Sequence, residues 1–232
     1  MHLLIPAAGS GRRFGADRNK LLLPLLGQPV LAWALQAADQ AQSITWIGII
    51  GQPGDRADME ALVDQLQLAT PVSWIQGGRE RQESVFNGLR SLPSGAQQVL
   101  IHDGARCLAT PTLFDRCSAA LQTCPAFVAA VPVKDTIKQV AADGTIAATP
   151  DRSTLWAAQT PQGFTVESLL RCHRQGLKQQ LAVTDDAALL EAFGLPVQIV
   201  EGEETNLKVT TPADLAIAEL ILKQRQFTAA IA

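Results

Sequence analysis

Several features that define common protein classes are missing from these 232 residues. No apolar run reaches the ~20 residues that a membrane span needs, and the N-terminus has no basic stretch followed by a long apolar one. The formal net charge of -3 provides no broad basic field for nucleic acid. We therefore expect a cytoplasmic globular protein that binds neither membranes nor nucleic acid.

Metal-binding and redox patterns are also scarce. The four cysteines include no C-x-x-C pair, which argues against a zinc site or a redox motif and favours free thiols in a reducing compartment. The three histidines, His2, His102 and His173, show no ligand spacing, so His102 is expected to be structural. No Ser-His-Asp arrangement can be argued from Ser10 or Ser84.

A loop of small residues follows the first apolar run, Leu3 to Ile5. This loop contains Gly9 and Gly11, and small residues allow backbone N–H groups to approach an anion closely. It leads into four cations that can hold phosphate oxygens, namely Arg12, Arg13, Arg18 and Lys20. We interpret the segment as a polyphosphate site; the alternative is an ordinary strand-to-helix turn with arginines in solvent.

Two better-known glycine-rich loops do not fit this segment. The dinucleotide fingerprint needs a third glycine where Phe14 stands, and an acid at the end of the second strand, which instead reads Ile49-Ile50-Gly51. The kinase-type P-loop needs a Gly-Lys pair, and the sequence has none. A dinucleotide-dependent oxidoreductase is therefore disfavoured.

Apolar runs alternate with helical patterns along most of the chain. Strands are expected at residues 3–5, 44–50, 71–75, 99–101, 127–132 and 197–200, and helices at 29–41, 57–68, 80–92, 112–124, 166–175, 185–193 and 211–224. Thr184 and Thr211 are the expected caps of the last two helices. This alternation predicts one α/β domain, residues 1–232, with a mostly parallel sheet and helices on both faces.

Ligands of such sheets bind beyond the carboxyl ends of the strands. The Gly9 loop, the Gly77-Gly78 turn with nearby Ser84, and Asp103 all fall at such ends. A carboxylate at position 103 can bind Mg²⁺ directly or through water, as polyphosphate sites usually arrange. The alternative is an ion pair with Arg106 that serves only the structure.

The other arginine and lysine residues are weaker candidates for the site. Arg79, Arg81 and Arg90 lie on or before one helix and are interpreted mainly as a solvated face. Arg152 and Lys208 stand alone in extended segments, and each, taken by itself, reads as a surface charge.

The alternation breaks after Val133. Two extended segments flank Asp143-Gly144, which predicts a β-hairpin within residues 134–155. A hairpin is marginal alone in water, so it must pack on something. It either lies flat on its own domain or forms an arm that packs on a second subunit.

These parts suit displacement at phosphorus. The transition state spreads negative charge over phosphoryl oxygens, which arginine and lysine stabilise. No general base is required if the nucleophile is itself a phosphate, whose second pKa is about 6.

The ordered motifs resemble those of the 2-C-methyl-D-erythritol 4-phosphate cytidylyltransferase family of the non-mevalonate isoprenoid pathway. The resemblance extends from Leu3 to Ala218. Its pieces are Pro6–Arg13, Leu23–Gly27, Gly77–Arg81 with Ser84-Val85, His102–Arg106, Pro132–Lys138, Asp151-Arg152, Trp156 with Gln159–Gln162, Thr184-Asp185, and Glu201-Gly202 with Asn206–Thr210. It implies a Rossmann-like nucleotidyltransferase fold and a magnesium-dependent reaction of CTP with methylerythritol phosphate, a sugar-alcohol phosphate.

The resemblance also implies roles for individual residues. Transition-state stabilisation is expected from Arg13 and Lys20, and Asp103 is expected at the magnesium ion and the substrate. The substrate phosphate and hydroxyls are expected to contact Arg106, Thr160 and Lys208.

A homodimer is implied as well, with the arm of one subunit reaching the site of the other. Thr136 and Arg152 are the arm residues expected there. The nucleotide is expected at Ala7, Ala8, Gly9, Gly11, Gly78 and Ser84.

Three positions depart from the family pattern. Asn19 precedes Lys20 where members often have proline, which predicts a less rigid loop. Cys107 follows Arg106 where proline is frequent, and Arg79 stands where some members have an acid. Two rival functions remain: a cytidylyltransferase for ribitol phosphate or another polyol phosphate, and a nucleotide-binding sensor without turnover.

Overall fold

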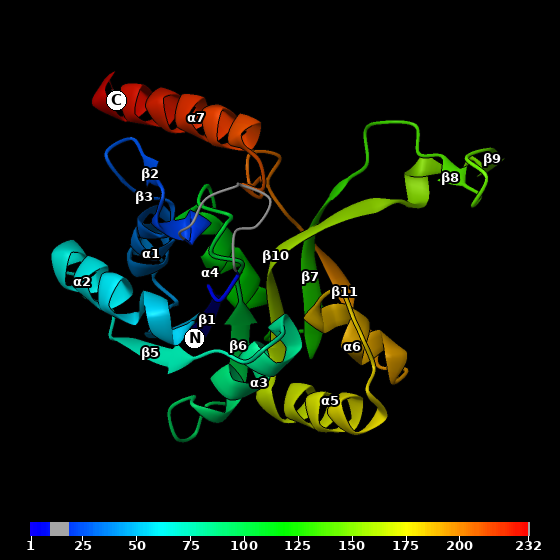
Figure 1. Cartoon of the computed structure of the whole chain (residues 1–232), viewed down its shortest axis with the longest axis horizontal. Helices are drawn as coiled ribbons and strands as arrows, with labels where there is room; N and C mark the ends of the chain where they lie inside the picture. The colour runs from blue at the N-terminus through cyan, green and yellow to red at the C-terminus, as the bar shows by residue number, and fades with distance from the viewer. Residues whose placement is uncertain (10–18, 232) are drawn as a thin grey trace.

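The computed structural model describes residues 1–9 and 19–231, and its centre is a seven-stranded sheet (Figure 1). The strands are β1 (His2–Pro6), β4 (Trp46–Gly51), β5 (Val72–Gln76), β6 (Gln98–Ile101), β7 (Ala126–Pro132), β10 (Trp156–Thr165) and β11 (Gln198–Glu201). Their order is β11-β7-β10-β6-β1-β4-β5. The predicted α/β class is confirmed.

The sheet is parallel except for one strand. β1 pairs in parallel with β4 and β6, β4 with β5, and β7 with β11, whereas β10 runs antiparallel between β6 and β7. The sequence pattern did not predict β10, because its first three residues are exposed and the strand lacks an apolar run. β10 changes register between Ala158 and Gln162, and this irregularity lies next to the carboxyl end of β6, whereas β7 continues alongside β10 beyond it.

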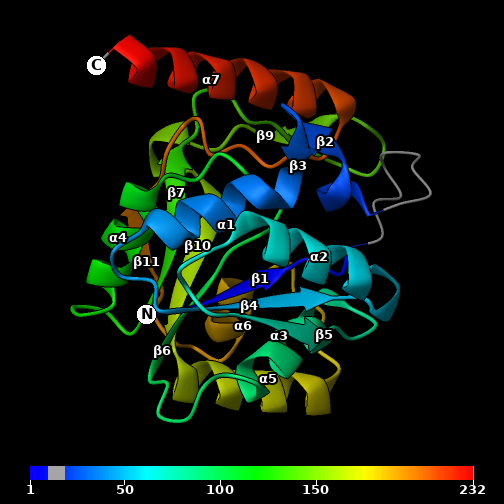
Figure 2. The same cartoon turned by 90° about the vertical axis from the view of Figure 1, so that its left-hand side faces the viewer.

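Helices cover both faces of the sheet (Figure 2). They are α1 (Val30–Gln40), α2 (Arg56–Leu66), α3 (Arg81–Arg90), α4 (Pro111–Ala120), α5 (Val166–Gln179), α6 (Asp186–Ala192) and α7 (Pro212–Ile231). One apolar cluster packs α1, α2, α4 and α7 on one face, and a second packs α3, α5 and α6 on the other. None of these helices, in the part of the chain described, is long and apolar enough to cross a bilayer.

Two helix ends differ from expectation. The cap of α6 is Asp185 rather than Thr184, because the Asp185 carboxylate accepts the N–H of Ala188 at 2.9 Å. α7 continues to Ile231 instead of ending near Gln224.

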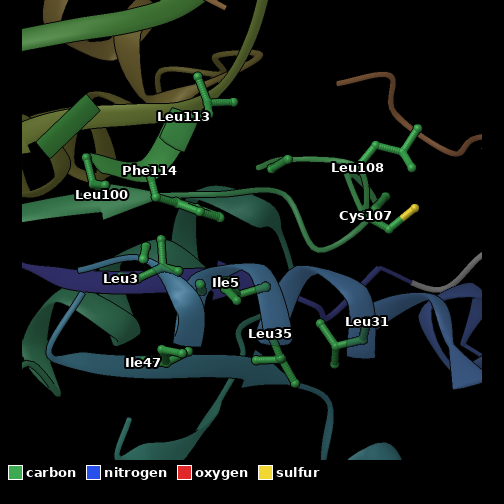
Figure 3. Packing of buried hydrophobic residues seen from close by; sticks show 14 of the residues in the cluster. Leu3, Ile5, Leu31, Leu35, Ile47, Leu100, Cys107, Leu108, Leu113 and Phe114 are labelled. Carbon is green, nitrogen blue, oxygen red and sulfur yellow. The ribbon is translucent and has the colours of Figure 1, made fainter. Parts of the chain in front are cut away.

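The core forms because the central strands are apolar on both faces, as a covered parallel sheet requires. Leu3 and Ile5 of β1 are fully buried and face Leu31 and Leu35 of α1, while Phe114 of α4 fills the adjacent space (Figure 3). Each such side chain contributes about 2 kcal/mol on burial. This rigid layer fixes the strand ends at which the polar residues gather.

The predicted hairpin is confirmed, with β8 (Gln139–Val140) antiparallel to β9 (Ile146–Ala148) and Gly144 at a φ of 86°. It does not lie flat on its own domain, since residues 134–149 are all exposed in the single chain (Figure 1). The arm, defined here as residues 134–155, thus leaves Val140 and Ile146 57% and 63% exposed.

Candidate active site

A cleft of about 620 Å³ opens at the carboxyl ends of β1, β4, β5 and β6. Its size is that of a small-molecule site. The predicted residues that line it are Ala8, Gly9, Lys20, Gly78, Ser84, Asp103 and Lys208. Residues far apart in the sequence therefore meet at one edge of the sheet, as the strand pattern predicts.

The remaining predicted residues include some that the structure does not describe and some that do not line this cleft. Gly11 and Arg13 fall outside the described residues. Ala7 is 1% exposed and belongs to the apolar core, between Pro6 and Ala8, which line the cleft. Thr136 and Arg152 lie on the exposed arm, where Arg152 donates to the Lys134 carbonyl at 2.9 Å.

The back of the cleft is built from backbone at the strand ends. Ala7 donates its N–H to Ile50 at 2.7 Å, and Gly77 donates to Gly51 at 2.8 Å. A Cβ on Gly77 would stand 2.9 Å from the Cβ of Ala8, so only glycine permits this approach. The two loops are consequently held side by side.

Ser84 shapes the Gly78 turn from the first turns of α3. Its hydroxyl accepts the N–H of Gly78 at 3.0 Å and donates to the Glu80 carbonyl at 2.9 Å. Arg79 is exposed, and its backbone N–H donates to Glu83 at 2.7 Å. Ser84 is 2% exposed, so it orders the cleft wall through Gly78.

The cleft holds an ion pair between Asp103 and Lys208, whose carboxylate oxygen and Nζ are 2.6 Å apart. Burial alone would raise the pKa of Asp103, but Lys208 and Arg81 outweigh it and lower that pKa. Lys208 is therefore no isolated surface charge. Asp103 stays ionised and available to a cation or a hydroxyl.

Arg106 does not form the structural pair with Asp103 that the sequence left open. Its Nη1 donates to the Asn206 carbonyl at 2.7 Å and its Nη2 to the Ala158 carbonyl at 3.2 Å. These contacts tie the Asp103 loop to β10 and to the segment that carries Lys208.

Lys20 belongs to the short helix η2 (Lys20–Leu22) and lines the cleft. Its Nζ donates to the Val209 carbonyl at 3.0 Å, and Val209 in turn donates its N–H to Ala105 at 2.8 Å. The two lysines of the cleft thus come from opposite ends of the chain and meet at the Asp103 loop.

Arg81 was wrongly interpreted as part of a solvated face. Its Nη1 is 2.7 Å from the buried Asp186, its Nη2 is 3.8 Å from Asp103, and His173 approaches the second oxygen of Asp186 at 3.3 Å. Burial would lower the pKa of Arg81, but the two aspartates raise it. Sequence patterns do not indicate this cluster, because His173 and Asp186 lie about 100 residues from Arg81 and on other helices.

His102 is structural, as expected. It is fully buried, with Nε2 3.0 Å from the Arg106 carbonyl and Nδ1 3.0 Å from the hydroxyl of Thr160. A carbonyl only accepts, so Nε2 carries the proton and Nδ1 accepts from Thr160. The Thr160 oxygen in turn accepts the N–H of Asp103 at 3.0 Å. This chain of bonds holds Thr160 against the Asp103 loop.

Burial lowers the pKa of His102 to about 4 from an ordinary value of 6.5. Because the unfolded chain takes up the proton first, stability due to His102 is complete above pH 6.5 and is lost as the pH falls towards 4. We expect the free energy of unfolding to fall by roughly 3 kcal/mol between pH 6.5 and pH 4. Urea unfolding at pH 7 and pH 4.5 measures it, and His102→Gln should flatten the difference; equal losses in both proteins would contradict this assignment.

A mostly parallel sheet, with lysines and a partly buried acid gathered at one edge around a cleft, fits a nucleotidyltransferase, and the comparison with known families shows that class. The family model described as "IspD: 2-C-methyl-D-erythritol 4-phosphate cytidylyltransferase" matches residues 1–224. The chain belongs to the 2-C-methyl-D-erythritol 4-phosphate cytidylyltransferase family.

Comparisons with individual proteins support the same family. A curated protein of that name from Synechococcus elongatus is 99% identical over 100% of both chains, and one from Acaryochloris marina is 67% identical over 97% of this chain and 95% of its own. The crystal structure of 4-diphosphocytidyl-2C-methyl-D-erythritol synthase from Anaerococcus prevotii superimposes with a TM-score of 0.85 at 29% identity, covering 96% of this chain and 97% of that one.

Proposed function

We propose that this chain transfers the CMP group of CTP to 2-C-methyl-D-erythritol 4-phosphate, which yields 4-diphosphocytidyl-2-C-methyl-D-erythritol and pyrophosphate. The observation that carries the proposal is the cleft in which Lys20 and Lys208 converge on the Asp103 loop, in a member of this family. The names of the relatives supply the acceptor, 2-C-methyl-D-erythritol 4-phosphate, and the cytidylyl group that is transferred; CTP is the donor that this group implies.

The reaction is an in-line displacement. An oxygen of the substrate phosphate attacks the α-phosphorus of CTP, the new P–O bond forms as the bond to the β-phosphate breaks, and pyrophosphate leaves with the electron pair. The nucleophile is already anionic near neutral pH, so no side chain has to remove a proton. Arg13 and Lys20 stabilise the charge that develops on the phosphoryl oxygens.

The nucleotide lies along the strand ends. Its phosphates meet the backbone of the first loop, and its ribose and base meet the wall that Ser84 orders through Gly78. The residues assigned to CTP are Ala7, Ala8, Gly9, Gly11, Gly78 and Ser84. For Ala7, which is buried and donates its N–H to Ile50, the contact is through the backbone carbonyl.

The sugar-alcohol phosphate lies on the Asp103 side. Lys208 positions its phosphate, and Asp103 accepts from its hydroxyls. Thr160 and Arg106 complete this side, and both are already tied to the Asp103 loop or its neighbours by the hydrogen bonds described above.

Mg²⁺ is proposed as the cofactor. Among residues 1–9 and 19–231, no group of three His, Cys, Asp or Glu side chains is placed to hold a metal ion. Mg²⁺ often uses one or two carboxylates together with substrate phosphates and waters, and Asp103 supplies one such carboxylate. The donor set therefore fits an ion that binds with the triphosphate, directly or through water, and that neutralises phosphate charge.

We further propose that the chain is a single domain whose arm serves dimerisation. The arm exposes Ile137, Val140 and Ile146, which need a partner surface. Thr136 and Arg152 would then reach the cleft of the other subunit, because they lie outside the cleft of their own chain.

Pyrophosphate release tests the proposal. The protein is assayed with CTP, Mg²⁺ and a panel of methylerythritol phosphate, ribitol phosphate and other polyol phosphates, and the highest kcat/KM is expected for the first. Preference for ribitol phosphate would establish the rival transferase. CTP binding without pyrophosphate release on any substrate would establish a sensor instead.

A further inference from the structure

Asn19, which immediately precedes Lys20, uses every polar atom of its side chain. It is 6% exposed. Its Oδ1 accepts the N–H of Leu21 at 3.1 Å, and its Nδ2 donates to the Ala7 carbonyl and to Asp55 Oδ2, each at 2.8 Å. An amide has two N–H donors and an oxygen with two lone pairs, so the contacts use both donors and one of the two acceptor positions.

The contact with Ala7 connects Lys20 to the central sheet. Ala7 follows the end of β1 and is itself fixed by its hydrogen bond to Ile50 of β4. The Asn19 amide therefore sets the position of the η2 turn against the strand ends that form the back of the cleft. The contact with Leu21 fixes the start of the same turn on the other side of Lys20.

The contact with Asp55 explains an acid that is otherwise out of place. Asp55 ends the short helix η3 (Pro53–Asp55) and lines the cleft, where a free carboxylate would repel a triphosphate. Asn19 occupies one oxygen of this carboxylate. Asp55 thus holds the Asn19 amide in place from the segment that follows β4.

We propose that Asn19 is the positioning residue for Lys20, with Asp55 as its partner. Three hydrogen bonds fix the backbone on either side of the lysine. Its ammonium group is therefore preorganised to contact the triphosphate. Asn19 has a φ of -57°, a value that proline would also adopt. The amide therefore supplies through hydrogen bonds the restraint that a proline ring would supply covalently. The inference rests on the proposed function of the site.

An isosteric change isolates this role. Asn19→Asp keeps the size and the acceptor but removes both donors and places a second carboxylate beside Asp55. We expect kcat to fall on the order of tenfold and KM for CTP to rise, because a misplaced lysine loses its alignment with the phosphates. KM for the polyol phosphate should not change, since Asp103 and Lys208 hold that substrate.

Restoring the pair should restore activity. In the double variant Asn19→Asp/Asp55→Asn, the new amide at 55 can donate to the new carboxylate at 19, so kcat should recover by about threefold or more relative to Asn19→Asp. Asp55→Asn alone should cost less than Asn19→Asp, because its amide oxygen still accepts. Asn87→Asp is the matched control: Asn87 also donates to a strand-end carbonyl, that of Gln76, but lies outside the cleft.

Thermal melting of each variant measures its folding stability, and calorimetric titration with CTP alone measures its affinity for the nucleotide. Together they separate an effect on folding from an effect on the site. A role limited to folding would lower the melting temperature and leave kcat and both KM values unchanged, which would overturn the proposal. Normal kinetics in Asn19→Asp, or an equal rise in KM for both substrates, would also overturn it. No recovery in the double variant would overturn the part of the proposal that makes Asp55 the partner of residue 19. If Asn19→Asp does not fold, Asn19→Ala is measured in its place, since it removes the donors without adding a charge. Failure of the wild-type protein to release pyrophosphate would instead refute the proposed function.

Discussion

Lys20→Ala is expected to lower kcat on the order of 100-fold or more, the effect typical of removing a preorganised charge stabiliser. Lys20 lines the cleft and contacts the segment that carries Lys208, so its charge is in place before substrate arrives. Pyrophosphate release at saturating CTP and polyol phosphate gives kcat directly.

A matched lysine shows whether the loss is specific. Lys223→Ala removes an exposed lysine that pairs with Glu219 within α7, outside the cleft, and should leave kcat unchanged. Normal turnover in Lys20→Ala would remove Lys20 from the mechanism.

Mixing two inactive variants should restore activity if the arm completes the site of the neighbouring subunit. Random exchange between Lys20→Ala and Arg152→Ala dimers makes half of the dimers hybrids, and each hybrid has one intact site. We therefore expect about one quarter of wild-type activity. The basis is the exposed arm, on which Arg152 lies away from the cleft of its own chain.

The assay follows pyrophosphate release after subunit exchange, with each variant exchanged against itself as the control. Exchange is verified by mass spectrometry of differently tagged chains. No recovery in verified hybrids would show that each site is complete within one subunit.

The sequence pattern predicts six of the seven strands of the central sheet and each of the seven α-helices in the described part of the chain. Residues such as Leu3, Ile47 and Leu100 lie in apolar runs that only a covered parallel strand explains, and the structure buries all of them. The sequence pattern does not predict β10, because its first three residues are exposed and it pairs antiparallel within an otherwise parallel sheet.

The cleft could be predicted in its location but not in its contacts. Strand ends placed Gly78 and Asp103 at one edge, yet nothing local indicated that Lys208 pairs with Asp103. The burial of Arg81 against Asp186 was also hidden, since a charged helix turn reads as solvated until the packing of α3 against α5 and α6 is known. Such pairings depend on tertiary packing, which single-sequence patterns do not encode.

The central claim is that the cations at the amino end of the chain hold the triphosphate of a bound nucleotide, opposite Asp103. A crystal structure with CTP and Mg²⁺ tests it most directly. The account predicts the triphosphate in the described cleft, with Lys20 Nζ and the Arg13 guanidinium on its oxygens and the base beside Gly78. A triphosphate bound elsewhere, with Lys20 and Arg13 directed into solvent, would contradict it.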